Sequence, residues 1–281
     1  MKLFMKFPEG KPKALTLSYD DGVEQDIRLL EILDRYGIKS TFNLNSRYYE
    51  KDEYTYEPGR IHRPLGKTRA VEVFSKAIEN GHEVATHGYT HPFLEQLPEE
   101  LAVYDMIRDR ERLEELFGGI IRGCAYPYGT FNDTAVDALR ACGLVYARNV
   151  VSSENFEIPT DWLRMPATCH HKNKNLMELA DKFVNKQPPK QKAWLFYLWG
   201  HSYEFESDNN WNVIEEFCEK VSGKDDIWYA SNIEIYDYID AYHRLRFSLN
   251  GKTVHNPTAT TVWFEKDGKI FKILPGETLK V

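Results

Sequence analysis

The chain has 281 residues, a length that fits one large α/β barrel or two smaller domains and allows a large buried core. Its formal net charge is −7 and its isoelectric point is near 5.8, and its lysines and arginines are scattered. These properties argue against binding to the phosphate backbone of nucleic acids, for which a basic patch is expected.

Neither a secretory leader nor a membrane span is predicted. The first eight residues lack the apolar stretch of a signal peptide. No run of about 18 apolar residues occurs anywhere in the chain. We therefore expect a soluble, cytoplasmic protein.

A disulfide framework or a thiolate zinc site is not expected, because no C-x-x-C pair occurs among the cysteines. The cysteines are Cys124, Cys142, Cys169 and Cys218.

Strand-like and helix-like segments alternate from Ala14 to about Leu245. The first apolar run, residues 14–19, precedes a helical pattern that begins near Glu24 and ends at Gly37. Strands that alternate with helices predict a parallel sheet, and about seven such units fit an irregular (β/α)7-type barrel. The other predicted strands are residues 40–44, 82–86, 121–126, 144–149, 194–199 and 226–230.

Among the further helices, one is predicted near residues 69–79 and another ends near His243. A long helix over residues 97–117 is closed by two glycines. Its apolar residues at helical spacing predict one buried face. The residues of that face are Val103, Ile107, Leu113 and Phe117.

The pattern changes after Arg246, where short alternating segments are separated by the hairpin dipeptides Asn250–Gly251 and Asp267–Gly268. We predict a barrel domain over residues 1–245 and a small β-rich appendage over residues 246–281. The appendage is too short to be stable alone, so it should pack on the barrel. It is either a sugar-binding addition or a lid over the barrel surface.

Polar residues that suit a metal site follow two of the predicted strands. Asp20 and Asp21 end the first strand, and His87 and His91, four residues apart, follow the third. The C-terminal ends of barrel strands lie on one face, so these side chains should meet. One aspartate and two histidines leave coordination positions open, as a catalytic metal requires.

Two further motifs follow predicted strands, and together the four motifs resemble those of the NodB-like polysaccharide deacetylases. These are metal-dependent enzymes that remove acetyl groups from amino sugars or acetylated glycans. The resemblance covers about residues 12–245, and the fold of the family is an irregular (β/α) barrel. The matching motifs are Asp20-Asp21-Gly22, His87-x-x-x-His91, Tyr126-Pro127-Tyr128-Gly129 and Leu198-Trp199-Gly200-His201.

The resemblance implies that Asp21, His87 and His91 hold a divalent ion. Zinc is the first expectation, with cobalt, nickel or manganese as alternatives, because mixed nitrogen and oxygen ligands select weakly among these metals. The resemblance also implies catalytic roles for three residues. Asp20 would be the general base, His201 the general acid, and the backbone N–H of Tyr128 an oxyanion donor.

Arg148 and Trp199 are the candidate substrate-binding residues. Trp199 would stack on a sugar ring. Many family members have an arginine that opens the third motif and is oriented toward the base, whereas this chain has Ala125. Arg148 is the first candidate to take its place, and Arg164 is the second.

Two weaker signals complete the analysis. Asp161–Trp162 is a loose counterpart of the Asp-Trp region that tunes the acid histidine in the family. His170 and His171 are adjacent, but we predict that they lie in a loop and form no metal cluster.

The leading hypothesis is a hydrolase of C–N bonds other than peptide bonds that deacetylates N-acetylated carbohydrate, or less readily O-acetylated carbohydrate. Two alternatives remain open. The first is a carbohydrate-binding pseudoenzyme, which the intact ligand set, base and acid argue against but which Ala125 keeps open. The second is a hydrolase of a small cyclic amide, with or without a metal. The complete Asp-His-His set favours the deacetylase.

Overall fold

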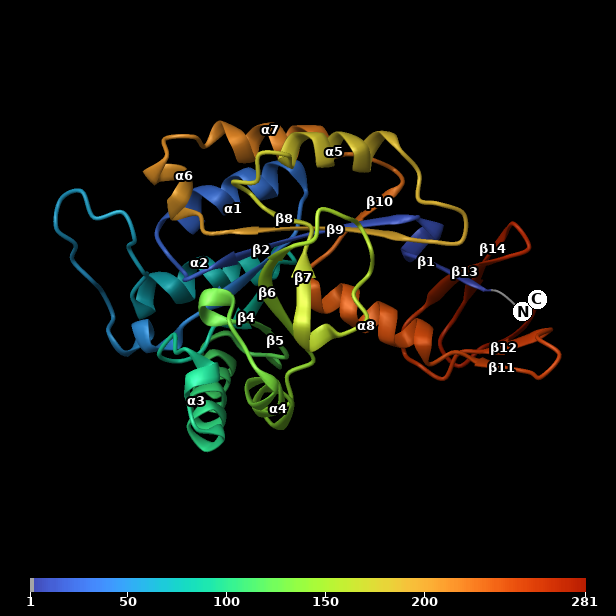
Figure 1. Ribbon diagram of the computed structural model, residues 1–281, viewed down its shortest axis with the longest axis horizontal. Coiled ribbons are helices and arrows are strands. Elements are labelled where there is room, and N and C mark those ends of the chain that lie inside the picture. The colour runs from blue at the N-terminus through green and yellow to red at the C-terminus, as the bar shows by residue number, and fades with distance from the viewer. Residues whose placement is uncertain (1–2) are drawn as a thin grey trace.

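The computed structural model describes residues 3–281 and is built around one sheet of nine parallel strands (Figure 1). The strands are β2 (Lys13–Asp20), β3 (Ser40–Leu44), β4 (Glu83–Thr86), β5 (Gly123–Ala125), β6 (Tyr146–Ser152), β7 (Met165–Ala167), β8 (Cys169–His170), β9 (Trp194–Gly200) and β10 (Ile227–Tyr229). Their order is β7-β6-β5-β4-β3-β2-β9-β8, with β10 paired to β2. All seven strands predicted in this region are present.

Strand β2 lies at the centre of the sheet, and all of its residues are buried. It pairs with β9 from Lys13 to Tyr19, with β3 along its C-terminal half, and with β10 along its first three residues. A strand that is covered on both faces has an almost continuous apolar sequence. This burial on both faces explains why the apolar run of residues 14–19 could be recognised in the sequence.

The sheet closes into an irregular barrel through one short segment that the sequence did not predict. Strand β7 pairs with β6 at one end of the sheet, and β8 pairs with β9 at the other end. Only Thr168 separates β7 from β8, and its N–H donates to the carbonyl oxygen of Tyr197 on β9 at 2.8 Å. The predicted barrel with a small C-terminal β appendage is confirmed.

Helices surround the barrel (Figure 1). Helix α1 ends at Gly37, as the sequence predicted. The left-handed φ of +64° at Gly37 lets its N–H donate to the carbonyl oxygens of Leu33 and Asp34 in the last turn of the helix. Among residues 3–281, no helix has both the length and the apolar character needed to cross a membrane. The α-helices are α1 (Gln25–Tyr36), α2 (Lys67–Glu79), α3 (Glu99–Phe117), α4 (Asp133–Ala141), α5 (Leu176–Asn185), α6 (Tyr203–Ser207), α7 (Asn212–Val221) and α8 (Asn232–His243). Short 3-10 helices are η1 (Pro8–Gly10), η2 (Ser46–Glu50), η3 (Leu94–Gln96), η4 (Pro127–Gly129) and η5 (Trp162–Arg164).

Helix α3 buries a different face from the predicted one. Leu113 is buried as expected, but Ile107 is 45% exposed. Met106 and two carboxylates one turn apart, Asp105 and Asp109, are buried instead. Neighbouring loops donate hydrogen bonds to both carboxylates, so these groups are buried without losing their partners.

The C-terminal residues form two antiparallel three-stranded sheets, and the N-terminal strand joins one of them. One sheet contains β1 (Phe4–Lys6), β13 (Val262–Lys266) and β14 (Lys269–Ile273), and the other contains β11 (Arg246–Phe247), β12 (Thr253–His255) and β15 (Thr278–Lys280). Buried Val262 and Phe264 pack with Ala241 and Leu245 at the end of α8. The domain boundary between residues 245 and 246 stays a prediction, and the structure adds residues 4–6 to the C-terminal sheets.

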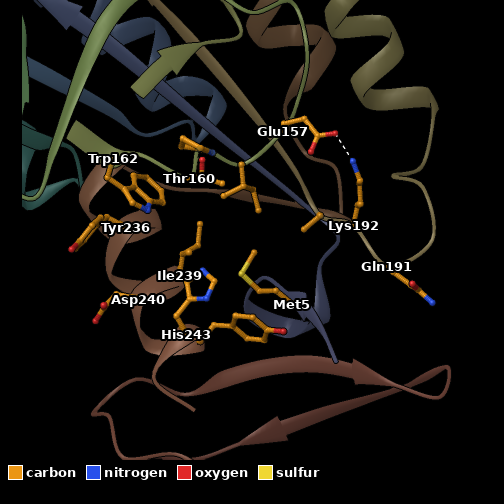
Figure 2. Close-up of a pocket in the computed structure, with 14 residues that line it drawn as sticks. Met5, Glu157, Thr160, Trp162, Gln191, Lys192, Tyr236, Ile239, Asp240 and His243 are labelled. Atoms are coloured by element: carbon orange, nitrogen blue, oxygen red, sulfur yellow. Dashed lines mark hydrogen bonds and ion pairs between the residues drawn. The ribbon is translucent and has the colours of Figure 1, made fainter. Parts of the chain in front are cut away.

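A cavity of about 590 Å³ lies between α8, the loop that follows β6 and the residues before β9 (Figure 2). Its lining includes Trp162 and Tyr236, and Lys192 pairs with Glu157 at its edge at 2.6 Å. Met5 and Lys192 precede β2 and β9, which places the cavity at the N-terminal ends of these strands. The predicted catalytic residues follow the opposite ends and do not line it.

We predict that Tyr238→Phe lowers the free energy of unfolding by about 1–3 kcal/mol, because it leaves two backbone groups without their partner. The Tyr238 hydroxyl donates to the carbonyl oxygen of Lys6 on β1 and accepts from the N–H of Trp263 on β13, at 2.9 Å for the latter. Urea denaturation of the variant measures the effect. The control is Tyr104→Phe, since Tyr104 is 63% exposed. Equal stability of both variants would contradict the prediction.

Candidate metal centre and active site

The polar residues predicted from the sequence lie at one end of the barrel. Strand β2 ends at Asp20, and His87 and His201 immediately follow β4 and β9. Because the strands are parallel, their C-terminal ends meet on the same face. Residues from three distant parts of the chain therefore share one site.

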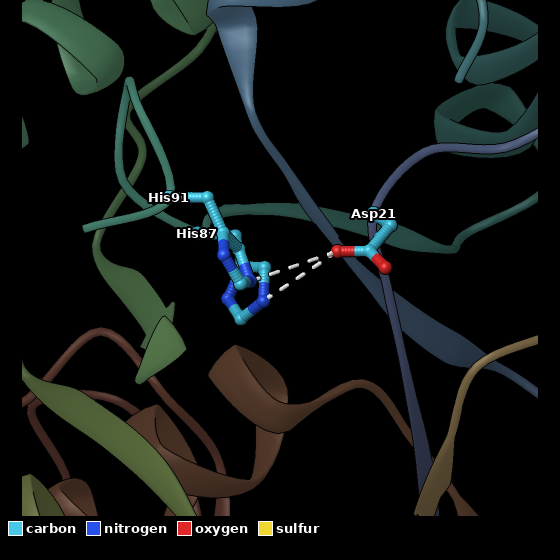
Figure 3. A group of neighbouring side chains, drawn as sticks. All are labelled: Asp21, His87 and His91. Carbon is cyan, nitrogen blue, oxygen red and sulfur yellow. Dashed lines mark ion pairs between the residues drawn. The ribbon is translucent and has the colours of Figure 1, made fainter. Parts of the chain in front are cut away.

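Asp21, His87 and His91 form a group whose candidate ligand atoms all lie within 4.8 Å of one another (Figure 3). The Oδ1 atom of Asp21 is 3.8 Å from Nε2 of His87 and 3.9 Å from Nε2 of His91. Asp21 and His91 have left-handed φ angles of +83° and +56°. Such angles are uncommon outside glycine and concentrate at functional sites.

The protonation of the three side chains fits a divalent cation. Nδ1 of His87 lies 2.8 Å from the carbonyl oxygen of Ala125, so Nδ1–H donates there and Nε2 is the ring atom that faces Asp21. Burial, assisted by nearby His87, lowers the pKa of His91 to about 4, which keeps this ring neutral. Burial alone would raise the pKa of Asp21, but a hydrogen bond from His62 and the neighbouring histidines lower it. One carboxylate and two neutral imidazoles suit zinc and similar metals.

Asp20 lies beside this group and is 2% exposed. Its Oδ1 accepts a hydrogen bond from Asn43 at 2.8 Å, and its Oδ2 pairs with Arg148. Burial alone would raise the pKa of Asp20, but the Arg148 guanidinium and then His87 lower it below its usual value. Asp20 is therefore an ionised carboxylate that can accept a proton.

Arg148 reaches Asp20 from the strand next to the one that carries Ala125. In the sheet register, Arg148 on β6 lies directly opposite Ala125 on β5. Arg164 instead pairs with two surface carboxylates, at 2.6 and 2.7 Å. Among the residues that the structure describes, Arg148 and not Arg164 thus contacts the carboxylate of Asp20.

The burial of Arg148 and Trp199 does not fit the direct substrate contacts predicted for them. Arg148 has no exposed surface and Trp199 is 7% exposed. The guanidinium carbon lies 4.2 Å from the centroid of the Trp199 ring, so it covers one face of the indole. Direct contact of Arg148 and Trp199 with a sugar stays a prediction, and the burial of both side chains does not favour it.

His201 stands between two carboxylates. Its Nε2 is 3.8 Å from Oδ2 of Asp20, and its Nδ1 is 3.3 Å from Oε2 of Glu204. Burial would lower the pKa of His201, but the hydrogen bond to Glu204 and the nearby carboxylates raise it above its usual value. The ring is thus held in its protonated form to a higher pH than a free histidine.

Sequence reasoning missed Glu204, which lies three residues after His201 in α6. Its carboxylate also contacts Nε2 of His170 at 3.1 Å and the ammonium of Lys172 at 3.2 Å. The interpretation of Asp161–Trp162 is therefore wrong, because Asp161 pairs with Arg164 and caps η5. The contact between His201 and Glu204 could have been predicted from their i, i+3 spacing, which places two side chains on the same face of a helical turn.

Two further side chains border the group of Asp21, His87 and His91: His62 from a loop and Tyr128 from η4. Nε2 of His62 lies 3.1 Å from Oδ2 of Asp21, and no sequence signal distinguished this isolated histidine. Tyr128 has a left-handed φ of +58°, and its ring, 51% exposed, stacks on Phe93 with centroids 3.8 Å apart. The Tyr128 ring also lies edge-on to His91, at 4.4 Å. This aromatic pair borders the metal ligands, unlike Trp199.

The segment that carries both histidine ligands is held by buried polar groups on neighbouring elements. Asp105 on α3 accepts hydrogen bonds from the N–H and the hydroxyl of Thr90, the latter at 2.7 Å. Asp109 accepts from Thr86 and from Ser46. Asn45 donates to the carbonyl oxygen of His87 at 2.6 Å. These contacts fix the backbone on both sides of the ligands.

Comparison with known proteins shows the family of this chain. The profile of the family described as polysaccharide deacetylase matches residues 8–147, and the chain belongs to this family. Among curated proteins, the uncharacterised protein YlxY of Bacillus subtilis is 22% identical over 130 residues. That match covers 46% of this chain and 35% of YlxY, so the chain spans about a third of the relative's length.

Solved structures share the fold at low sequence identity. A protein from Mycobacterium smegmatis assigned to the polysaccharide deacetylases is 19% identical with a TM-score of 0.60, covering 85% of this chain and 94% of the other. A family 4 carbohydrate esterase from Streptomyces lividans, in complex with acetate, is 18% identical with a TM-score of 0.50, covering 78% and 92%. A family 4 acetyl xylan esterase from Clostridium thermocellum, in complex with a cobalt ion, is 12% identical with a TM-score of 0.50, covering 80% and 90%.

We predict that Asp105→Ala weakens metal binding by about tenfold, because Thr90, next to His91, loses its anchor. Competition with a chromophoric chelator measures the dissociation constant. The matched control is Asp137→Ala, which removes an exposed carboxylate from α4. An unchanged dissociation constant in a folded Asp105→Ala variant would show that the loop needs no such anchor.

Proposed function

We propose that this chain is a metal-dependent hydrolase that removes acetyl groups from N-acetylated carbohydrate, with O-acetylated carbohydrate as a second substrate class. The observation that carries the proposal is a single cluster at the end of the barrel. It combines the Asp21, His87 and His91 ligand set with the ionised carboxylate of Asp20 and with His201. The relatives bound to acetate or described as an acetyl xylan esterase support the same reaction class.

Asp21, His87 and His91 would hold the metal through Oδ1, Nε2 and Nε2. When bound, a divalent cation supplies Lewis-acid polarisation and lowers the pKa of water at the site. Zinc is the first candidate, with cobalt, nickel and manganese as alternatives, and one relative contains cobalt. The contact from Ala125 to His87 orients this ligand, and His62 does the same for Asp21.

Asp20 would act as the general base. It is ionised, and its contact with Arg148 holds Oδ2 in place beside His87. A general base of this kind must lie close to the metal ligands but must not itself bind the metal. Asp20 meets this requirement because Asp21, the next residue, provides the ligand.

His201 would act as the general acid that protonates the leaving amine or hydroxyl. Its Nδ1 is occupied by Glu204, so Nε2 is the atom that faces Asp20 and the reaction centre. The two proton-transfer groups thus stand 3.8 Å apart on the same site. The base would receive a proton while the acid delivers one.

The backbone N–H of Tyr128 is the proposed oxyanion donor. Tyr128 has a left-handed backbone conformation and its ring lies against His91, and Gly129 after it has a φ of +73°. A fixed donor of this kind contributes about 3–4 kcal/mol to transition-state stabilisation in other enzymes. The exposed rings of Phe93 and Tyr128 replace Trp199 as the proposed sugar platform.

We also propose that residues 1–245 form the catalytic barrel and that residues 246–281 pack on it with the N-terminal strand. Two alternative functions are a cyclic-amide hydrolase and a carbohydrate-binding pseudoenzyme. The following test distinguishes both of them from the deacetylase.

Two substitutions test the assignment of base and ligand together. Asp20→Asn should retain about one metal per chain and lose about 10²- to 10⁴-fold in turnover, because the base is absent while the ligands remain. His87→Ala should lose the metal and the activity. The measurement is elemental analysis combined with acetate release from acetylated chito-oligosaccharides. A fully active Asp20→Asn variant, or a His87→Ala variant that still carries one metal, would refute the assignment.

Glu204→Gln should move the alkaline limb of the pH profile to lower pH. The carboxylate raises the pKa of His201, so the acid form persists to higher pH in the parent protein and is lost earlier in the variant. The profile of kcat/KM against pH measures this shift. Glu206→Gln, two residues away and paired with Arg63, is the control. An unshifted alkaline limb would mean that Glu204 does not tune the acid.

A further inference from the structure

A second cavity, of about 370 Å³, opens beside the metal centre between the residues after β3 and the segment that carries the ligands. His91 forms part of its wall. A ligand in this cavity would therefore lie next to a sugar whose acetyl group is at the metal. Asn45 and Thr90 in its wall also hold the segment of the ligands, whereas its other side chains, apart from His91, have no role in the proposed reaction.

Three tyrosines give the cavity aromatic walls: Tyr48, Tyr54 and Tyr89. Tyr48 and Tyr54 meet edge-on with ring centroids 6.2 Å apart. Aromatic rings offer large apolar surfaces with a polar edge, which suits the alternating C–H and hydroxyl surfaces of a sugar ring. The walls thus favour a carbohydrate over a purely apolar ligand.

A buried acceptor in the cavity lacks a partner. Asn45 lines the cavity and is 2% exposed, and its Nδ2 is occupied by the carbonyl oxygens of His87 and Gly88. Its Oδ1 has no hydrogen-bond partner among residues 3–281. A buried acceptor without a partner is unfavourable, and a ligand hydroxyl or amide N–H would satisfy it.

The cavity also carries an excess of positive charge, although the whole chain has a net charge of −7. Arg47 and Lys51 line it. Within the described part of the chain, Glu50 is the one carboxylate in its lining, and this group pairs with Arg108 at 3.1 Å and accepts the hydroxyl of Tyr89. The two cations therefore face the cavity with no acidic residue in its wall left to neutralise them.

We propose that this cavity is a subsite for a sugar residue that bears a carboxylate or phosphate group and is linked to the acetylated sugar. The inference rests on the proposed function and deepens it by naming the substrate class, an acetylated anionic glycan. Arg47 would bind the anionic group through its planar guanidinium, with Lys51 adding a second charge. Asn45 would accept a hydroxyl, and the tyrosines would pack on the ring.

The experiment compares three acetylated oligosaccharides of equal length with the metal-loaded protein. One is neutral chito-oligosaccharide, one alternates N-acetylglucosamine with glucuronic acid, and one is phosphorylated chito-oligosaccharide. We expect the parent protein to prefer at least one anionic substrate, and the two anionic arms identify carboxylate or phosphate. Arg47→Gln should reduce the ratio of kcat/KM for the anionic to the neutral substrate about tenfold, mainly through KM.

Two further variants make the result specific. Arg47→Lys should restore part of the preference, because it keeps the charge without the planar fork. Arg140→Gln removes an exposed arginine on α4 that is 61% exposed and paired with Asp137, and it should leave the ratio unchanged. A general loss of packing would lower activity on all substrates alike and would not respond to the lysine.

The outcomes separate the subsite from the reaction. Acetate release with the same substrate ratio in the parent protein and in Arg47→Gln would overturn the subsite and leave the proposed function intact. If metal-loaded protein releases acetate from none of the three substrates, the proposed function fails. Calorimetric titration with the same oligosaccharides then decides the subsite: weaker binding of the anionic ones by Arg47→Gln supports it, and equal binding overturns it.

Discussion

The structure of the site depends on two adjacent carboxylates, Asp20 and Asp21, at the end of a fully buried strand. A buried negative charge is costly unless it is paired or binds a metal. Each carboxylate meets this requirement differently. Arg148 and Asn43 surround Asp20, whereas His62, His87 and His91 surround Asp21. This difference in surroundings supports the proposed division of roles, in which Asp20 transfers a proton and Asp21 binds the metal.

Buried or partly buried acids on the surrounding helices extend this arrangement outward. Asp105 and Asp109 on α3 anchor the loop of the histidine ligands, and Glu204 on α6 holds His201. All three accept hydrogen bonds from groups at the carboxyl ends of the strands. The helices therefore contribute polar anchors to the site as well as apolar surface to the core, and their rigidity is transmitted to the catalytic groups.

The loop between η2 and α2 joins the two sides of the site. It supplies His62 to Asp21, and its Arg63 pairs with Glu206 on α6 at 2.8 Å and with Glu24 at the start of α1. Figure 1 shows this loop extending from the barrel near α6. Lys51 at the start of this loop and Arg47 in the preceding η2 line the cavity beside His91. One segment of the chain thus contacts the carboxylate of Asp21 and lines the cavity proposed as a subsite.

The fold and the main site residues could be predicted from the sequence, because both depend on local patterns. Fully buried strands are apolar along their whole length, and parallel strands bring the residues after them to one face. Asp20, Asp21, His87, His91 and His201 could therefore be grouped before the structure was known. The short strands β7 and β8 escaped prediction because two or three residues carry no periodicity.

The sequence by itself determined the barrel and the set of groups available for chemistry, since these follow from hydrophobic periodicity and motif spacing. Only the tertiary structure decided which partner each group has. Arg148 contacts Asp20 because β6 lies beside β5, Glu204 contacts His201 because the chain turns into α6 there, and His62 reaches Asp21 from a loop. Trp199 is buried, and the Arg148 guanidinium covers one face of its ring. Such pairings depend on distances across the fold, and no spacing along the chain encodes them.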